Sequence, residues 1–113
     1  MSASSQPLEV TPTELKRQWD AGERPLIIDV REQDEWEIAN LSAYDAQLIP
    51  LSQFARRMAE VPKDRDVVMQ CRSGGRSAQA QRLLQKAGYT RVRNLSGGIL
   101  GWADKVDPSL PKY

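Results

Sequence analysis

Two short, almost continuously apolar runs stand out along the chain, over residues 26–30 and 67–70. Each has the length of a β-strand and shows no alternation of apolar and polar positions, a pattern typical of strands covered on both faces in a parallel sheet. Shorter runs over residues 48–50 and 91–93 predict two further strands. Residues 1–10, which are polar around Leu8 and Val10, predict an arm or a short edge strand.

Between these runs, apolar residues recur at helical spacing. They predict helices over residues 12–21, 53–61, 76–87 and 99–106, and one or two helical turns over 34–39. The segment Thr11-Pro12-Thr13-Glu14 has the form of a capping box with proline at the first helical position, and Gly22 and Gly88 follow predicted helix ends. Strands that alternate with helices indicate an α/β domain with a mainly parallel central sheet, flanked by helices on both faces.

The length of 113 residues indicates a single domain over residues 1–113. We expect a core over about 8–107, an N-terminal arm over 1–7 and a C-terminal tail over 108–113. The 16 Lys and Arg residues nearly balance the 15 Asp and Glu residues, so nothing indicates nucleic acid as a partner. The first six residues lack the features of a signal peptide, and no apolar run has membrane-spanning length. We therefore expect a cytoplasmic monomer without a membrane partner.

The residues that are missing exclude several kinds of site. The sequence has no histidine, which excludes a Ser-His-Asp triad, a Cys-His pair and histidine-bearing zinc sites. It has one cysteine, which excludes a CxxC redox pair, a four-cysteine metal site and an internal disulfide. We expect neither a metal nor an organic cofactor.

That one cysteine, Cys71, follows the apolar run 67–70 and opens the loop Cys71-Arg72-Ser73-Gly74-Gly75-Arg76, which leads into a predicted helix. A strand, a glycine-bearing loop and a helix N-terminus together favour a bound anion. Backbone N–H groups, the helix end and two guanidinium groups all favour the thiolate over the thiol. Because ligands bind beyond the carboxyl ends of parallel strands, we expect Asp29 and Arg31, at the end of the first apolar run, to lie near Cys71.

Four segments in this order resemble the rhodanese-like domain family of sulfurtransferases over roughly residues 8–107. They are Asp29-Val30-Arg31-Glu32, Ile49-Pro50-Leu51, Cys71-Arg72-Ser73-Gly74-Gly75-Arg76-Ser77, and Gly97-Gly98-Ile99 followed by Trp102. Residues 102–113 are also similar to the rhodanese domains fused behind ubiquitin-like-protein activating enzymes, which hand sulfur to a protein thiocarboxylate.

The resemblance implies a catalytic cycle. The Cys71 thiolate takes the outer sulfur of thiosulfate or of a protein persulfide, and a persulfide forms on Cys71. An acceptor then removes that sulfur; acceptors in the family are thiols, cyanide or a protein thiocarboxylate. A thiol with an ordinary pKa is only about 3% thiolate at pH 7, so the surroundings of Cys71 must lower its pKa.

The residues around Cys71 receive expected roles. The backbone amides from Ser73 to Ser77 hold the outer sulfur, and Gly74 and Gly75 allow the backbone to approach it closely. Arg72 and Arg76 supply positive charge. Asp29 and Arg31 support the site by organising the end of the sheet. A second reading of Arg76 is structural, as a bridge from the loop to Asp29 or Glu35.

Two positions depart from vertebrate-type thiosulfate enzymes of the family. Those enzymes carry a lysine at the third loop position and an arginine shortly after the first motif, where this sequence has Ser73 and Glu35. The loss of two cations predicts that the dianion thiosulfate is a poor donor and a protein persulfide a better one.

Three alternatives stand beside sulfur transfer. Cys71 could be an inert core cysteine. The fold could serve as a non-catalytic binding module, which would not need Cys71. A small cysteine phosphatase or arsenate reductase is the third, but its loop is one residue longer than the four residues that separate Cys71 from Arg76 here.

Overall fold

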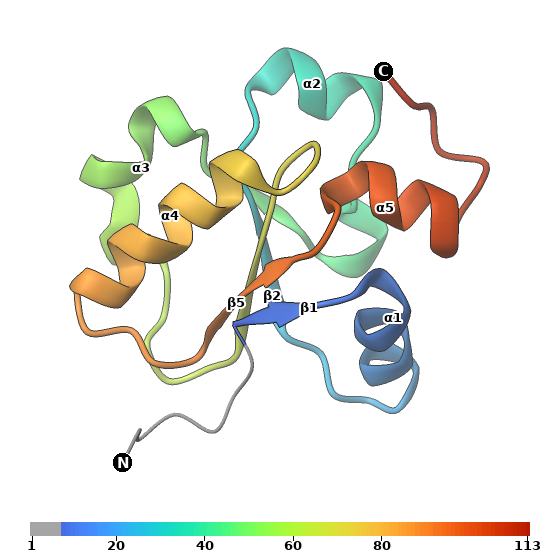
Figure 1. Ribbon diagram of the computed structural model, residues 1–113. Helices are drawn as coiled ribbons and strands as arrows, with labels where there is room; N and C mark the ends of the chain where they lie inside the picture. The colour runs from blue at the N-terminus through green and yellow to red at the C-terminus, as the bar shows by residue number, and fades with distance from the viewer. Residues whose placement is uncertain (1–7) are drawn as a thin grey trace.

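The computed structural model describes residues 8–113, so the predicted arm over 1–7 and the signal-peptide question lie outside the described residues. Within 8–113, five strands form one parallel sheet in the order β1-β5-β4-β2-β3 (Figure 1). The strands are β1 Glu9–Val10, β2 Leu26–Asp29, β3 Gln47–Leu48, β4 Val67–Gln70 and β5 Val92–Leu95. The prediction of a parallel sheet is confirmed, with the two apolar runs as adjacent strands β2 and β4.

Helices follow the strands along the chain, as predicted. They are α1 Pro12–Asp20, α2 Gln33–Ile38, α3 Leu51–Arg57, α4 Gly75–Lys86 and α5 Gly98–Lys105, with 3₁₀ turns at Ser42–Tyr44 and Met58–Glu60. The capping box of α1 is present, because Thr11 and Glu14 exchange two hydrogen bonds. The helix predicted over 53–61 begins earlier and ends in the second 3₁₀ turn, since apolar spacing alone separates the two helix types poorly.

The helices cover both faces of the sheet: α3 and α4 pack on one face, and α1 and α5 on the other (Figure 1). Alternate residues of each central strand point into the two layers. The layer under α3 and α4 includes Ile28, Phe54, Val67, Met69 and Leu84. The opposite layer includes Leu15, Ile27, Val68, Ile99 and Trp102. Burial on both faces explains why β2 and β4 are apolar without alternation.

The register of β2 and β4 brings two distant segments together at one edge of the sheet. Asp29 pairs with Gln70, and the N–H of Val30 donates to the carbonyl of Gln70 (2.9 Å). Cys71 therefore leaves the sheet beside the Asp29–Arg31 segment, as predicted.

Residues 108–113, expected as a tail, fold back onto this edge. Leu110 and Tyr113 pack against the core layer of α1 and α5. Among the described residues, no helix has the length and apolar character needed to cross a membrane.

Candidate active site

Cys71 lies at the N-terminal end of α4, with its sulfur turned into the loop. It is buried, and its Sγ accepts a hydrogen bond from the backbone N–H of Gly74 (3.1 Å) and lies 3.2 Å from the hydroxyl of Ser77. Gly74 has φ +116°, a left-handed conformation that L side chains rarely adopt, and it is the residue that caps α4. This glycine lets the chain turn tightly enough to aim an amide at the sulfur.

The start of α5 holds the carbonyl groups of the same loop. The N–H groups of Ile99 and Leu100 donate to the carbonyls of Cys71 (2.9 Å) and Arg72 (3.1 Å). Gly98 makes this approach possible, because a Cβ on it would lie 2.4 Å from the Arg72 carbonyl oxygen. With these carbonyls turned toward α5, the loop amides are free to face the sulfur.

These donors favour the thiolate form of Cys71. Burial by itself raises the pKa of the thiol, but the hydroxyl of Ser77 and the amides of Ser77, Gly74 and Ser73 outweigh it, so that the pKa lies below its ordinary value. The effect comes from the neighbouring hydroxyl and amide dipoles, and Arg72 and Arg76, which were expected to contribute, are not among its main causes.

Asn94, which the sequence did not single out, contacts two groups beside the sulfur, the Ser77 hydroxyl and the Gly74 carbonyl. It lies in β5, is buried, and its Oδ1 is 2.6 Å from the Ser77 hydroxyl, while its Nδ2 donates to the Gly74 carbonyl (3.0 Å). No clear signal for it is present in the sequence, because the predicted strand over 91–93 ended before Asn94 and its burial appears only in the structure.

Arg76 forms a bidentate ion pair with Glu35, with N···O distances of 2.7 and 2.8 Å. This contact matches the structural reading of Arg76. The hydrogen bonds from Arg76 lower the pKa of Glu35 to about 2, so the carboxylate is ionised at neutral pH. The positive charge of Arg76 beside the loop is thus already paired.

Arg72 is half-buried beneath Tyr113 rather than open to solvent. Its guanidinium lies 5.0 Å from the centre of the Tyr113 ring and donates a hydrogen bond to the Tyr113 carbonyl. The Tyr113 hydroxyl in turn donates to Glu35 (2.9 Å). Residues expected to be a tail therefore form part of the wall beside the Cys71 loop.

Asp29 and Arg31 form a fully buried ion pair (Nη2···Oδ2 2.7 Å) behind this wall. All five N–H donors of the Arg31 guanidinium find acceptors. These acceptors are the carboxylate of Asp29, the carbonyls of Glu35 and Ala39, and the hydroxyl of Tyr113. The pair thus ties β2 to α2 and to Tyr113.

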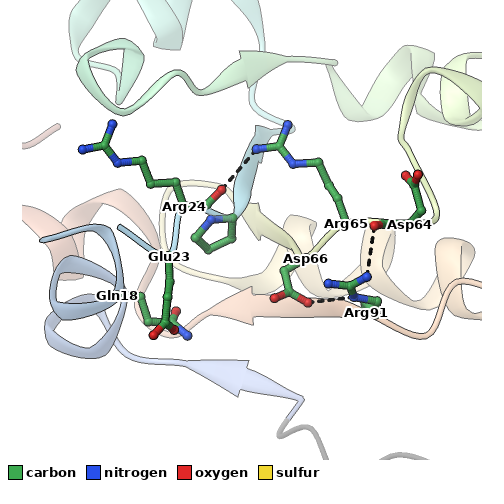
Figure 2. Close-up of a pocket in the computed structure, with 8 residues that line it drawn as sticks. Gln18, Glu23, Arg24, Asp64, Arg65, Asp66 and Arg91 are labelled. Carbon is green, nitrogen blue, oxygen red and sulfur yellow. Dashed lines mark hydrogen bonds and ion pairs between the residues drawn. The ribbon is translucent and has the colours of Figure 1, made fainter. Parts of the chain in front are cut away.

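A polar hollow of about 350 Å³ lies at the opposite edge of the sheet (Figure 2). Pro25, Asp66 and Arg91, which line it, directly precede strands β2, β4 and β5. The rest of its lining is Gln18, Glu23, Arg24, Asp64 and Arg65. Its acidic and basic groups are mixed, and the sheet separates it from Cys71. In residues 8–113, no group of three or more Cys, Asp or Glu side chains is placed to hold a metal ion.

Comparison with known proteins agrees with this geometry. The family model described as "Rhodanese-like domain" matches residues 11–105. A curated protein of Allochromatium vinosum named "Sulfurtransferase" is 44% identical over 95 residues, covering 84% of this chain and 87% of that protein. The "Probable adenylyltransferase/sulfurtransferase MoeZ" of Mycobacterium tuberculosis is 39% identical over 106 residues, covering 92% of this chain and 26% of that protein.

The chain therefore spans about a quarter of the length of the Mycobacterium tuberculosis relative. Among solved structures, a rhodanese-like domain protein from Staphylococcus aureus superposes with a TM-score of 0.79 at 26% identity, covering 88% of this chain and 95% of that one.

Proposed function

This chain belongs to the rhodanese-like domain family, and from that premise we propose that it is a sulfurtransferase that carries sulfur as a persulfide on Cys71. Relatives named as sulfurtransferases support sulfur transfer in general. The observation that carries the specific proposal is the surroundings of Cys71 Sγ, which lies against the N–H of Gly74 and the hydroxyl of Ser77. These donors favour the nucleophilic thiolate of Cys71.

The transfer takes place in two displacements. The Cys71 thiolate attacks the outer sulfur of the donor, a bond forms between the two sulfurs, and the donor's own sulfur–sulfur bond breaks as its leaving group departs, a thiolate from a persulfide or sulfite from thiosulfate. An acceptor nucleophile then attacks the outer sulfur of the Cys71 persulfide, and the electron pair of the broken bond returns to Sγ. The chain's lone cysteine cannot resolve the persulfide by itself, so the acceptor comes from outside.

Each loop residue has a proposed role in this cycle. The amides from Ser73 to Ser77, including those of Gly74 and Gly75, hold the negative outer sulfur at the N-terminal end of α4. Arg72 and Arg76 border the space above the loop. Asp29 and Arg31 keep the supporting edge of the sheet in place.

The charges around the loop favour a persulfide over thiosulfate as the donor. Arg76 already pairs with Glu35, so a dianion would enter beside an ionised carboxylate, and the Arg72 guanidinium is partly covered by the Tyr113 ring. We propose a persulfide of a protein or small thiol as the donor. The proposed acceptors are a thiol or a protein thiocarboxylate, and cyanide in the test tube.

The direct test is the intact mass of the protein after separate incubation with thiosulfate and with a cysteine desulfurase plus cysteine. We expect the mass of one added sulfur atom, which cyanide removes and which is missing in Cys71→Ser. Strong loading from the desulfurase together with weak loading from thiosulfate supports a persulfide as the donor. Failure of both donors to load the folded, reduced protein overturns the sulfurtransferase proposal and favours a binding module.

The donor preference has a test of its own in Glu35→Gln, which removes the carboxylate charge and frees Arg76. We expect this variant to load faster from thiosulfate, while loading from the desulfurase changes little. Equal changes with the two donors would show that Glu35 does not select against the dianion.

A further inference from the structure

The hydroxyl of Ser77 has a single hydrogen and more than one acceptor within reach. Its Oγ lies 2.6 Å from Oδ1 of Asn94, 3.2 Å from Sγ of Cys71 and 3.3 Å from the Gly74 carbonyl oxygen. Ser77, Asn94 and Cys71 are all buried, so water does not supply further donors to them. Whichever acceptor takes the hydrogen, the others go without it.

The orientation of the Asn94 amide is fixed by its second contact. Its Nδ2 donates to the Gly74 carbonyl (3.0 Å), which leaves Oδ1 facing Ser77. Since Oδ1 carries no hydrogen, the 2.6 Å contact requires Ser77 to be the donor. In this arrangement Ser77 presents only lone pairs to Cys71, which suits a protonated thiol that donates its own hydrogen.

When Cys71 loses its proton, it needs a hydrogen from Ser77 rather than a lone pair. A thiolate then faces a hydroxyl lone pair at 3.2 Å unless the Ser77 hydrogen turns toward it. In the persulfide the inner sulfur is bonded and uncharged, and the negative charge has moved to the outer sulfur. The Ser77 hydroxyl therefore again donates its hydrogen bond to Oδ1 of Asn94.

We propose that Asn94 is a positioning residue. It keeps the Ser77 hydroxyl hydrogen directed away from Cys71 in the thiol and persulfide states, and the hydrogen turns to Cys71 when the free thiolate forms. The proposal deepens the proposed sulfurtransferase function and rests on it for the persulfide state. During discharge, negative charge returns to Sγ as its bond to the outer sulfur breaks. Ser77 turns to donate at that moment, so its hydrogen bond stabilises the departing thiolate more than the persulfide.

The test is the pKa of Cys71 in a double-mutant cycle of Ser77→Ala and Asn94→Leu. The chain has one cysteine, so thiolate absorbance measured against Cys71→Ser reports this residue alone. Asn94→Leu keeps the branching at Cγ without a polar atom, and the Gly74 carbonyl retains its bond from the Ala78 N–H (3.2 Å). Asn94→Ala replaces it if the leucine variant does not fold.

We expect opposite shifts in the two single variants. Ser77→Ala removes a donor from the thiolate and raises the pKa by about half a unit to one unit. Asn94→Leu removes the competing acceptor and lowers the pKa by a similar amount. In the Ser77→Ala background the Asn94 substitution changes nothing, because no hydroxyl remains to be redirected.

A purely structural Asn94 gives a different pattern. If its only task were to hold the Gly74 carbonyl, its loss would misplace the Gly74 amide and raise the pKa equally with and without Ser77. That result, no shift at all, or any shift that persists in the Ser77→Ala background overturns the proposal. The titration uses no sulfur donor, so it can fail while persulfide loading succeeds, and the reverse also holds.

Discussion

The ion pairs at the two edges of the sheet differ in how deeply they are buried. At the Cys71 edge, Asp29 and Arg31 are completely buried and bound to each other. At the opposite edge, Asp66 and Arg91 pair at 3.0 Å in the hollow of Figure 2, but their side chains remain 43% and 49% exposed. The hollow is thus lined by solvated charges, whereas the ion pair at the Cys71 edge is shielded from water.

Chain direction in a parallel sheet explains this difference. Helix α4 begins at the Cys71 loop, so its free N–H groups and the positive end of its dipole face the sulfur. Gln18 and Glu23 of the hollow flank the C-terminal end of α1, where the dipole is negative. For a sulfur anion, the direction of the backbone dipoles matters more than the volume of a hollow.

The largest expected contrast is between Asp29→Ala and Asp66→Ala. Removing Asp29 leaves the buried Arg31 guanidinium without its carboxylate and destabilises the fold by about 3–5 kcal/mol. Removing Asp66 breaks an exposed pair and costs about 1 kcal/mol or less. Urea unfolding of both variants measures the difference, and similar losses would contradict this account of the two edges.

The next contrast compares Gly98→Ala with Gly22→Ala. Both glycines have positive φ, +61° and +87°, so each substitution incurs backbone strain of about 1–2 kcal/mol. A Cβ on Gly22 meets nothing within 4 Å, whereas one on Gly98 must displace the Arg72 carbonyl. We expect Gly98→Ala to be destabilised by about 2–3 kcal/mol and to load sulfur at least about tenfold more slowly.

Stopped-flow loading together with unfolding curves separates these two effects. Gly22→Ala serves as the control, because it carries the strain without the close approach and leaves the Cys71 loop intact. Equal loading rates in the two variants would mean that α5 does not hold the loop in its active shape.

A smaller effect is expected from Glu35→Gln, and it depends on pH. The folded pKa of Glu35, about 2, lies below its ordinary value of 4.5, so its contribution to stability is complete above pH 4.5 and is lost as the pH falls toward 2. With Arg76 35% exposed, we expect this contribution to be about 1–2 kcal/mol. Unfolding free energies from neutral to acidic pH should therefore converge for the variant and the wild type. A constant gap across this range would assign the loss to something other than the carboxylate charge.

The smallest effect is expected from Arg91→Gln in the hollow. This change breaks the pair with Asp66 and a hydrogen bond to the Asp64 carbonyl (3.0 Å), both at exposed positions. We expect a loss of about 0–1 kcal/mol, which shrinks further in high salt, and no change in sulfur loading. Slower sulfur loading of Cys71 in this variant would show that the hollow takes part in the proposed reaction.

Much of the fold was predictable because it follows from local patterns. The apolar runs of β2 and β4 identified the parallel sheet, and the capping box with Gly22 located α1. Helix α3 begins two residues before the predicted start and ends four residues before the predicted end, and the boundaries of β5 shift by one to two residues, since the ends of elements depend on hydrogen bonds that apolar spacing does not encode.

The contacts of the candidate site were only partly predictable. Cys71 and its loop stood out because the glycines and arginines are contiguous. Asn94 did not, because it approaches Ser77 from another strand, 17 positions away. Tyr113 was expected in a tail, yet it contacts Arg31 from a distance of 82 positions.

By itself the sequence determined the α/β class, the central strands and the cysteine loop, because burial of apolar area fixes which residues face the core. Only the tertiary structure decided which partner each polar group takes: Glu35 for Arg76, Tyr113 for Arg72 and Asn94 for Ser77. The physical reason is that hydrogen bonds and ion pairs act over a few ångströms and depend on direction. Their choice therefore follows from how distant segments are packed, which no local pattern specifies.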